Sequence, residues 1–217
     1  MPHTSRRAVI AGAGALAASS AMAQTPAPSP APAPAPAVPA TPLPRVVIET
    51  GQGAIIIELA ADKAPITSAN FLRYVDAKRF DGATFYRAMT LQPKPLTGLL
   101  QGGAKNDPAK AFPPIAHEST QQTGLSNKDG AVSMARYAPG TAASEFFICV
   151  GDLSSLDADP KQSGDNLGFA VFAHVVQGME VVKAILADPV SATKGEDSGM
   201  RGQILDPEVV MVSVRRL

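Results

Sequence analysis

Arg87 and Gln101 are the two side chains of this sequence whose chemistry stands out. Arg87 ends the run Phe85-Tyr86-Arg87, and Gln101 opens the run Gln101-Gly102-Gly103. A guanidinium carries a permanent positive charge on a planar fork of donors, which suits it to stabilise electron density on a substrate. A glutamine amide offers both donor and acceptor groups, and the glycines allow another backbone to approach closely. These residues predict a site that stabilises electron density on a substrate and forms hydrogen bonds with it.

Other catalytic groups are scarce. Beyond the N-terminal leader the histidines are His117 and His174, and their spacing fits no metal-ligand pattern. His174 follows an apolar run and is interpreted as structural, and a catalytic pair of His117 with Glu118 is disfavoured. The sequence contains no G-x-S-x-G nucleophile motif and no phosphate-binding P-loop. We therefore expect no metal and no cofactor.

Four short motifs follow one another in a fixed order. They are Phe85-Tyr86-Arg87, Gln101-Gly102-Gly103, Ser133-Met134-Ala135 and Ser144-Glu145-Phe146-Phe147-Ile148. Together they resemble the F-[HY]-R, Q-G-G, S-M-A and S-[QE]-F-F-I motifs of the cyclophilin-type peptidyl-prolyl isomerases. The resemblance extends from about Arg45 to Leu217. It implies a mainly β fold, a closed eight-stranded antiparallel β-barrel with two capping α-helices.

The resemblance also implies an activity, the cis–trans isomerisation of X-Pro bonds in unfolded or looped polypeptides. The obstacle is amide resonance, with a barrier of about 18–20 kcal/mol, and no bond is broken. Arg87 is the expected catalytic residue, because its guanidinium can donate to the proline carbonyl and to the lone pair of the twisted imide nitrogen. Phe147 is the expected floor of the proline pocket, whereas Phe146 should face the other way by strand alternation. The remaining expected substrate-binding residues are Gln101, Ala135, Leu156, Leu99 and Phe169.

Several positions depart from the family pattern. Gly98 and Leu99 stand where members often have a Phe-Met pair, and the run from Arg87 to Gln101 is longer than usual. Ser155 replaces a frequent tryptophan on which cyclosporin binding draws, and Phe169 replaces a pocket histidine. Glu145 replaces a more frequent glutamine and Arg136 an asparagine, which changes the charge at the groove. Two functions therefore stay open: an isomerase, or a peptide-binding module or holdase chaperone with little turnover.

The pattern of apolar residues predicts many short strands and two helices. A Gly51-Gln52-Gly53 hairpin should join the first two strands, and Pro65 should begin a helix that ends near Arg79. Residues 103–129 are expected to form a loop. The other expected elements are strands at 46–50, 54–59, 83–89, 97–101, 131–136, 145–150, 168–175 and 209–214, and a helix from Met179 to Leu186. Many strands with few helices favour a barrel or a sandwich, and pattern alone does not choose between them.

The first 44 residues are expected to lie outside this domain. Residues 1–23 resemble a signal peptide of the twin-arginine type, with Arg6-Arg7, an uncharged apolar run and a cleavage site after Ala23. A Sec signal is the alternative. Residues 24–44 are rich in Pro and Ala and predict a semi-rigid spacer. The domain should then occupy residues 45–217, exported to the periplasm or beyond, without membrane insertion after cleavage.

The composition limits the kinds of partner expected for the exported chain. The full chain has 19 basic and 19 acidic residues, so loss of Arg6 and Arg7 leaves 17 basic residues and a formal net charge of −2. Nothing in this balance points to nucleic acid. The one cysteine, Cys149, excludes an internal disulfide and is expected to be a buried thiol. Proline-containing polypeptides are the expected partners, and the protein is expected to be a monomer.

Overall fold

The structure is a computed structural model that describes residues 42–105, 107–161 and 163–217. The expected signal peptide, residues 1–23, and all of the expected spacer up to residue 41 lie outside the described residues. None of the helices in the described part of the chain is long and apolar enough to cross a membrane.

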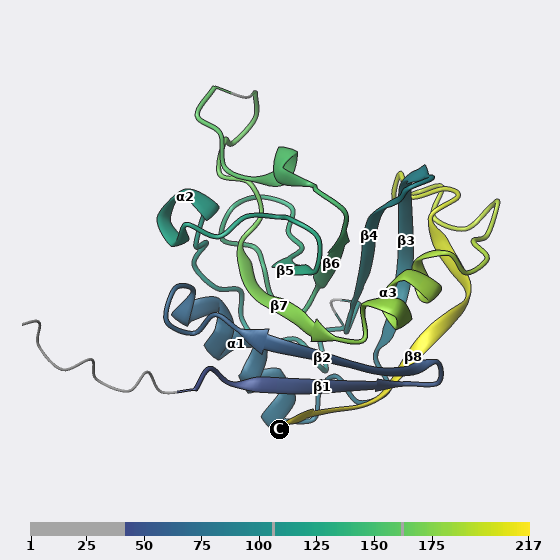
Figure 1. Ribbon diagram of the computed structural model, residues 1–217, viewed down its shortest axis with the longest axis horizontal. Helices are drawn as coiled ribbons and strands as arrows, with labels where there is room; N and C mark the ends of the chain where they lie inside the picture. Colours follow the sequence, from purple (N-terminus) through teal and green to yellow (C-terminus); the bar gives the residue numbers. More distant parts are fainter. Residues whose placement is uncertain (1–41, 106, 162) are drawn as a thin grey trace, which may run out of the picture. The chain divides into compact units, whose positions relative to one another are not determined.

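Eight strands form a closed barrel in the order β1-β2-β7-β5-β6-β4-β3-β8 (Figure 1). Every neighbouring pair in this order is antiparallel. Closure pairs each strand on both sides, which removes the exposed edges of an open sheet. The expected eight-stranded antiparallel barrel is confirmed. The strands are β1 Arg45–Thr50, β2 Gly53–Leu59, β3 Thr84–Pro93, β4 Leu96–Gly103, β5 Ala131–Met134, β6 Phe146–Val150, β7 Val171–Gln177 and β8 Ile204–Arg216.

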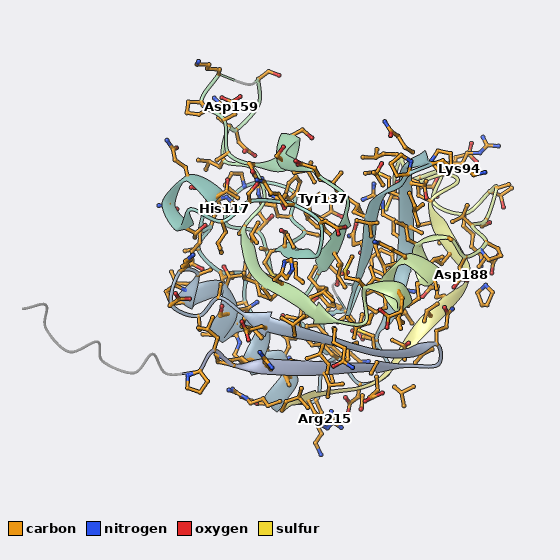
Figure 2. The ribbon with its side chains drawn as sticks, in the orientation of Figure 1. Lys94, His117, Tyr137, Asp159, Asp188 and Arg215 are labelled. Atoms are coloured by element: carbon orange, nitrogen blue, oxygen red, sulfur yellow. The ribbon has the colours of Figure 1, made fainter. Side chains whose placement is uncertain are left out.

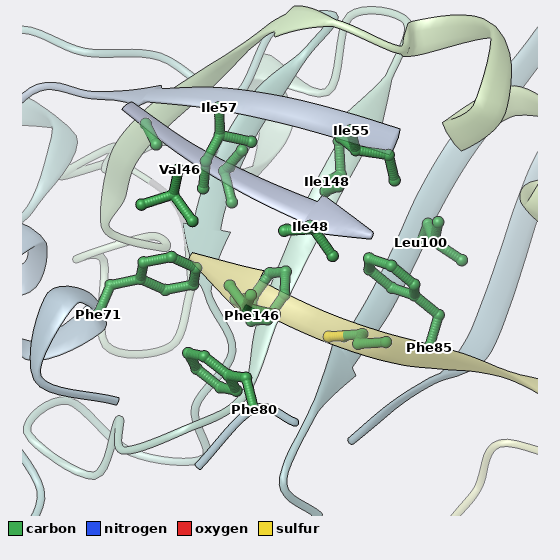
Figure 3. Packing of buried hydrophobic residues seen from close by; sticks show 14 of the residues in the cluster. Val46, Ile48, Ile55, Ile57, Phe71, Phe80, Phe85, Leu100, Phe146 and Ile148 are labelled. Carbon is green, nitrogen blue, oxygen red and sulfur yellow. The ribbon is translucent and has the colours of Figure 1, made fainter. Parts of the chain in front are cut away.

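Alternate side chains of the strands fill the barrel. Ile55 and Ile57 of β2 are fully buried, and Thr50 pairs with Gly53 across the expected hairpin. Phe146 of β6 lies in this core, where its ring meets that of Phe71 edge-on at 5.4 Å (Figure 3). Phe147 belongs to a second apolar cluster on the opposite face of the sheet. The alternation expected at this pair is therefore confirmed.

Two of the three α-helices in the described residues are those expected from sequence. Helix α1 spans Pro65–Asp76 and packs against β7 and β8, whereas α3 spans Met179–Leu186 and packs against β2, β3, β4 and β6. The end expected for α1 near Arg79 is wrong by three residues. Lys78 takes a φ of +54°, a left-handed conformation that does not continue a helix.

A third helix was not expected. The four-residue α2, Thr120–Thr123, lies within the segment 103–129 that was expected to be a loop. Its sequence carries the signal that predicts it: Ser119 and Gln122 form a capping box, and Gly124 follows in the left-handed conformation. Nearby, the buried carboxylate of Glu118 accepts hydrogen bonds from the backbone N–H groups of Ile66 and Thr67. Glu118 therefore stabilises the N-terminus of α1, a structural role.

The long run between Arg87 and Gln101 forms a β-hairpin. Strands β3 and β4 pair from Thr84 and Gly103 to Pro93 and Leu96, and Lys94 stands at the tip (Figure 2). Gly98 is required by a close approach, because a Cβ there would lie 2.1 Å from the carbonyl oxygen of Met89. The glycine in place of an aromatic residue therefore follows from the backbone of the hairpin.

Candidate active site

A pocket of about 350 Å³ lies on the outer side of β4, β5 and β6. This volume falls within the usual range of small ligand sites. The structure brings together here every site residue that the sequence predicts: Arg87, Leu99, Gln101, Ala135, Phe147, Leu156 and Phe169. These residues come from strands β3, β4 and β6, from the 3-10 helix Ser154–Leu156, and from the segments after β5 and before β7. The barrel therefore assembles them from distant parts of the chain.

Arg87 is half-buried at one side of the pocket and is fixed by three contacts. Its Nε donates to Gln203 Oε1 at 2.8 Å, and one terminal nitrogen donates to Gln101 Oε1 at 2.9 Å. The other terminal nitrogen contacts the sulfur of Met89 at 3.3 Å. A guanidinium has five N–H groups, so among the described residues two N–H groups remain for a substrate. Burial lowers the pKa of Arg87 from its ordinary value, and an arginine stays charged at neutral pH.

Gln101 is buried and is oriented by two further side chains that also line the pocket. Its Nε2 donates to the hydroxyl of Tyr86 at 2.7 Å, and that hydroxyl donates to Glu145 Oε2 at 2.7 Å. Burial and the neighbouring Glu145 carboxylate raise the pKa of Tyr86 far above its ordinary value, so this hydroxyl stays protonated. Ser144 Oγ donates to the other carboxylate oxygen at 2.9 Å.

The glycines of the Q-G-G motif make room for the protein itself. A Cβ on Gly103 would lie 2.7 Å from Glu145 Oε1, and one on Gly102 would lie 2.7 Å from the carbonyl oxygen of Thr84. The close approach expected at these glycines is thus made by neighbouring parts of the barrel.

Aromatic and aliphatic side chains form the rest of the pocket. Phe147 is only 3% exposed, and its ring meets that of Phe169 edge-on at 5.4 Å. Leu99 and Leu156 belong to the same apolar cluster. Cys149 lies in this cluster as a buried thiol, as expected, and burial raises its pKa to about 12. The pocket therefore has an apolar floor with polar groups along one side.

Phe169 is held by Arg136, whose side chain is 4% exposed. The guanidinium of Arg136 donates to both carboxylate oxygens of Asp165 and to the carbonyl of Gly168, and it lies 5.2 Å from the Phe169 ring centroid. The Arg136 hydrogen bond lowers the pKa of Asp165 to about 2. Arg136 therefore does not add an uncompensated positive charge to the groove, because Asp165 pairs with it.

Sequence reasoning missed several residues at this site. Met89 could have been found, because it lies two residues after Arg87 and strand alternation predicts the same face. Tyr137, labelled in Figure 2, follows the S-M-A motif closely. Its side chain is 85% exposed and lines the pocket. Met200 and Gln203 come from the loop before β8, and no local sequence motif predicts that they reach the pocket. The residues not anticipated are Tyr86, Met89, Tyr137, Thr141, Met200 and Gln203.

Metal ligands are not gathered in the described ranges. No group of three or more His, Cys, Asp or Glu side chains there is arranged to hold an ion. His117 Nε2 lies 3.0 Å from the carbonyl oxygen of Leu167, and His174 is exposed on β7. Both histidines stand outside the residues that line the pocket.

Known proteins resemble this chain over most of its length. Residues 45–213 match the family described as cyclophilin type peptidyl-prolyl cis-trans isomerase/CLD. A peptidyl-prolyl cis-trans isomerase of Acinetobacter baylyi is 36% identical, over 78% of this chain and 84% of the relative. Peptidyl-prolyl cis-trans isomerase B of Escherichia coli is 34% identical, over 78% of this chain and 97% of the relative.

The fold is also that of a solved cyclophilin. The crystal structure of a cyclophilin type peptidyl-prolyl cis-trans isomerase of Cryptosporidium parvum superposes with a TM-score of 0.63. That comparison covers 81% of this chain and 98% of the other at 18% identity. With this fold and with bacterial relatives above 30% identity, the chain belongs to the cyclophilin-type peptidyl-prolyl cis-trans isomerase family, and its activity is that of an isomerase.

Proposed function

We propose that this isomerase accelerates X-Pro isomerisation in exported polypeptides and that Arg87 is its catalytic residue. The observation that carries this proposal is the orientation of Arg87 at the pocket. Gln101 and Gln203 hold the guanidinium from two sides, and two N–H groups remain for a substrate. No other described residue that lines the pocket combines a fixed positive charge with donors left over in this way, since Arg136 pairs with Asp165.

The proposed mechanism follows from the reaction. When the X-Pro amide twists, resonance is lost and the imide nitrogen becomes pyramidal and gains a lone pair. Donors from Arg87 to that nitrogen and to the proline carbonyl stabilise the twisted form more than the planar one, which is the condition for catalysis. The proline ring lies on Phe147, and the small side chain of Ala135 leaves space for the substrate backbone. Gln101 holds the flanking peptide group.

The proposed role follows from the slow uncatalysed reaction. About 10–30% of X-Pro bonds are cis in unfolded chains, and exchange takes tens of seconds or more. An isomerase in the exported compartment shortens this step for proteins that fold there. The proposed clients are unfolded or looped proline-containing polypeptides, and the proposed form of the enzyme is a monomer.

A protease-coupled assay on an X-Pro peptide tests the activity. We expect the domain of residues 45–217 to accelerate cis–trans exchange catalytically, at enzyme concentrations far below that of the peptide. A domain that binds the peptide without accelerating exchange would instead be the peptide-binding module or holdase named as the alternative.

The N-terminal residue of the isolated protein tests whether it is exported and cleaved. From Arg6-Arg7 and the Ala21-Met22-Ala23 run, we expect the protein isolated from its native compartment to begin at Gln24. N-terminal sequencing measures this directly, and an uncleaved protein in the cytoplasm would contradict it. Replacement of Arg6-Arg7 by Lys-Lys tests the route, because undiminished export would favour Sec over the twin-arginine path.

Weak inhibition by cyclosporin is expected. Ser155 occupies the position of the family's tryptophan, and in the structure it is exposed and lines a neighbouring hollow, not the main pocket. The whole chain contains no tryptophan. Loss of a large aromatic contact costs about 3–5 kcal/mol in a packed site and less at a half-exposed one. Titration of the drug against turnover measures the effect, with Ser155→Trp as the comparison. Tight inhibition of the unmodified domain would contradict the expectation.

A further inference from the structure

Arg87, Gln101, Tyr86 and Glu145 are joined in one chain of hydrogen bonds. Arg87 donates to Gln101, Gln101 donates to the Tyr86 hydroxyl, and this hydroxyl donates to Glu145, at 2.9, 2.7 and 2.7 Å. This series of hydrogen bonds begins at Arg87, the proposed catalytic residue, and reaches the carboxylate of Glu145, which is 5% exposed. All four residues line the pocket, so the series follows its polar wall.

The groups at the two ends determine in which direction each hydrogen bond of this series is donated. A guanidinium only donates, and an ionised carboxylate only accepts. Tyr86, whose one O–H is directed to Glu145, can only accept from Gln101. Gln101 must then direct its NH₂ to Tyr86 and its carbonyl oxygen to Arg87. The inverted amide would place an N–H group against the guanidinium, so Tyr86 and Glu145 determine which way Gln101 faces.

Burial makes these internal partners decisive. Gln101 is 7% exposed and Glu145 is 5% exposed, so water does not readily replace a missing partner. A polar group that loses its partner in such a site pays the full cost of its desolvation. Two features of the backbone bring the members together. A β-bulge between Phe85 and Arg87 turns Tyr86 toward the same pocket as Arg87, and Gly103 leaves space for the Glu145 carboxylate.

We propose that Tyr86 and Glu145 are positioning residues of this isomerase, which act on catalysis by holding the Gln101 amide in the orientation that accepts from Arg87. This inference rests on the proposed function, because it assumes that Arg87 acts on the substrate. It gives Glu145 a role other than a change of groove charge, and it assigns Tyr86 to the active site.

The first test is Tyr86→Phe, which removes the hydroxyl and keeps the ring. We expect kcat for an X-Pro peptide to fall about tenfold, equivalent to about 1.4 kcal/mol, with little change in KM. Tyr74→Phe is the matched control, because it also removes a hydrogen-bonded tyrosine hydroxyl, but outside the pocket. Tyr74 lies in helix α1, and its buried hydroxyl accepts a hydrogen bond from the backbone N–H of Phe112 at 2.7 Å. The control should lose thermal stability while its kcat stays that of the wild type.

Variants at Glu145 and Gln101 test whether Tyr86 acts through this hydrogen-bonded series. Glu145→Gln keeps an acceptor for Tyr86 and should retain most of the activity, whereas Glu145→Ala should match Tyr86→Phe. In a Gln101→Ala background, Tyr86→Phe should have almost no further effect, because the residue through which it acts is already absent. If Tyr86→Phe fails to fold, the two Glu145 variants make the same comparison.

The outcomes separate this inference from the proposed function. Wild-type protein without turnover would overturn the proposed function. Normal turnover that depends on Arg87, together with an unchanged kcat in Tyr86→Phe or Glu145→Ala, would overturn the positioning role alone. Additive losses in the Tyr86 and Gln101 double variant would also overturn it, because Tyr86 would then act independently of Gln101.

Discussion

Arg87→Ala is expected to lower kcat/KM for an X-Pro peptide by about 10²–10³-fold while the barrel remains folded. Removal of one preorganised donor from a transition state costs about 2.7–4 kcal/mol in a comparable electrostatic site. Arg87 is only half-buried and lines the open pocket, outside the main core of the barrel, so the fold should tolerate the change. Exchange spectroscopy on a proline peptide measures the rate, and the melting temperature measures the fold.

Arg79→Ala is the matched control for this experiment. Arg79 is also half-buried, donates to the carbonyl of Lys110 at 2.7 Å and lies 3.7 Å from the Phe112 ring centroid, outside the residues that line the pocket. Its loss should reduce stability and leave the rate per folded molecule unchanged. Arg87→Lys keeps the charge and loses the planar fork, so most of the activity should still be lost. An unchanged rate in Arg87→Ala would contradict the assignment of Arg87.

The barrel was predictable because its signals are short-range or carried by motifs. Each local signal predicts a particular element: two-residue alternation predicts strands, the Gly51–Gly53 segment predicts a hairpin, and Pro65 predicts the start of α1. These local signals do not distinguish a closed barrel from a β-sandwich, because the strands of both show the same alternation. The four ordered motifs supplied that information through the family resemblance.

The residues of the pocket were predictable where they lie in one of the four motifs or match a position of the family pattern. Tyr86 was missed because strict alternation sends it away from Arg87, and the β-bulge that turns both to one side depends on pairing with β4. Gln203 was missed because it reaches Arg87 from a loop more than a hundred residues later. Phe169 was found by position, but the contacts of Arg136 that hold it depend on how the neighbouring loop folds.

Phe146 and Phe147 make a matched pair that separates stability from activity. The two residues are adjacent on β6, but Phe146 contacts the rings of Phe71, Phe80 and Phe85 in the main core. Phe146→Ala should lower the free energy of unfolding by about 3–5 kcal/mol, because it leaves a cavity among those rings. The activity per folded molecule, measured at low temperature, should stay close to that of the wild type.

Phe147→Ala is expected to show the opposite profile. The ring of Phe147 belongs to the smaller apolar cluster and lines the pocket. Truncation therefore enlarges a space that solvent already reaches and should cost less stability than Phe146→Ala. Loss of the apolar surface proposed to hold the proline ring, worth about 1.5–3 kcal/mol for a buried aromatic side chain, should lower kcat/KM about tenfold to a hundredfold. Chemical denaturation and the exchange assay on both variants measure the two effects together. Equal losses of activity per folded molecule in the two variants would contradict the pocket-floor assignment, because only one of the rings faces the proposed proline site.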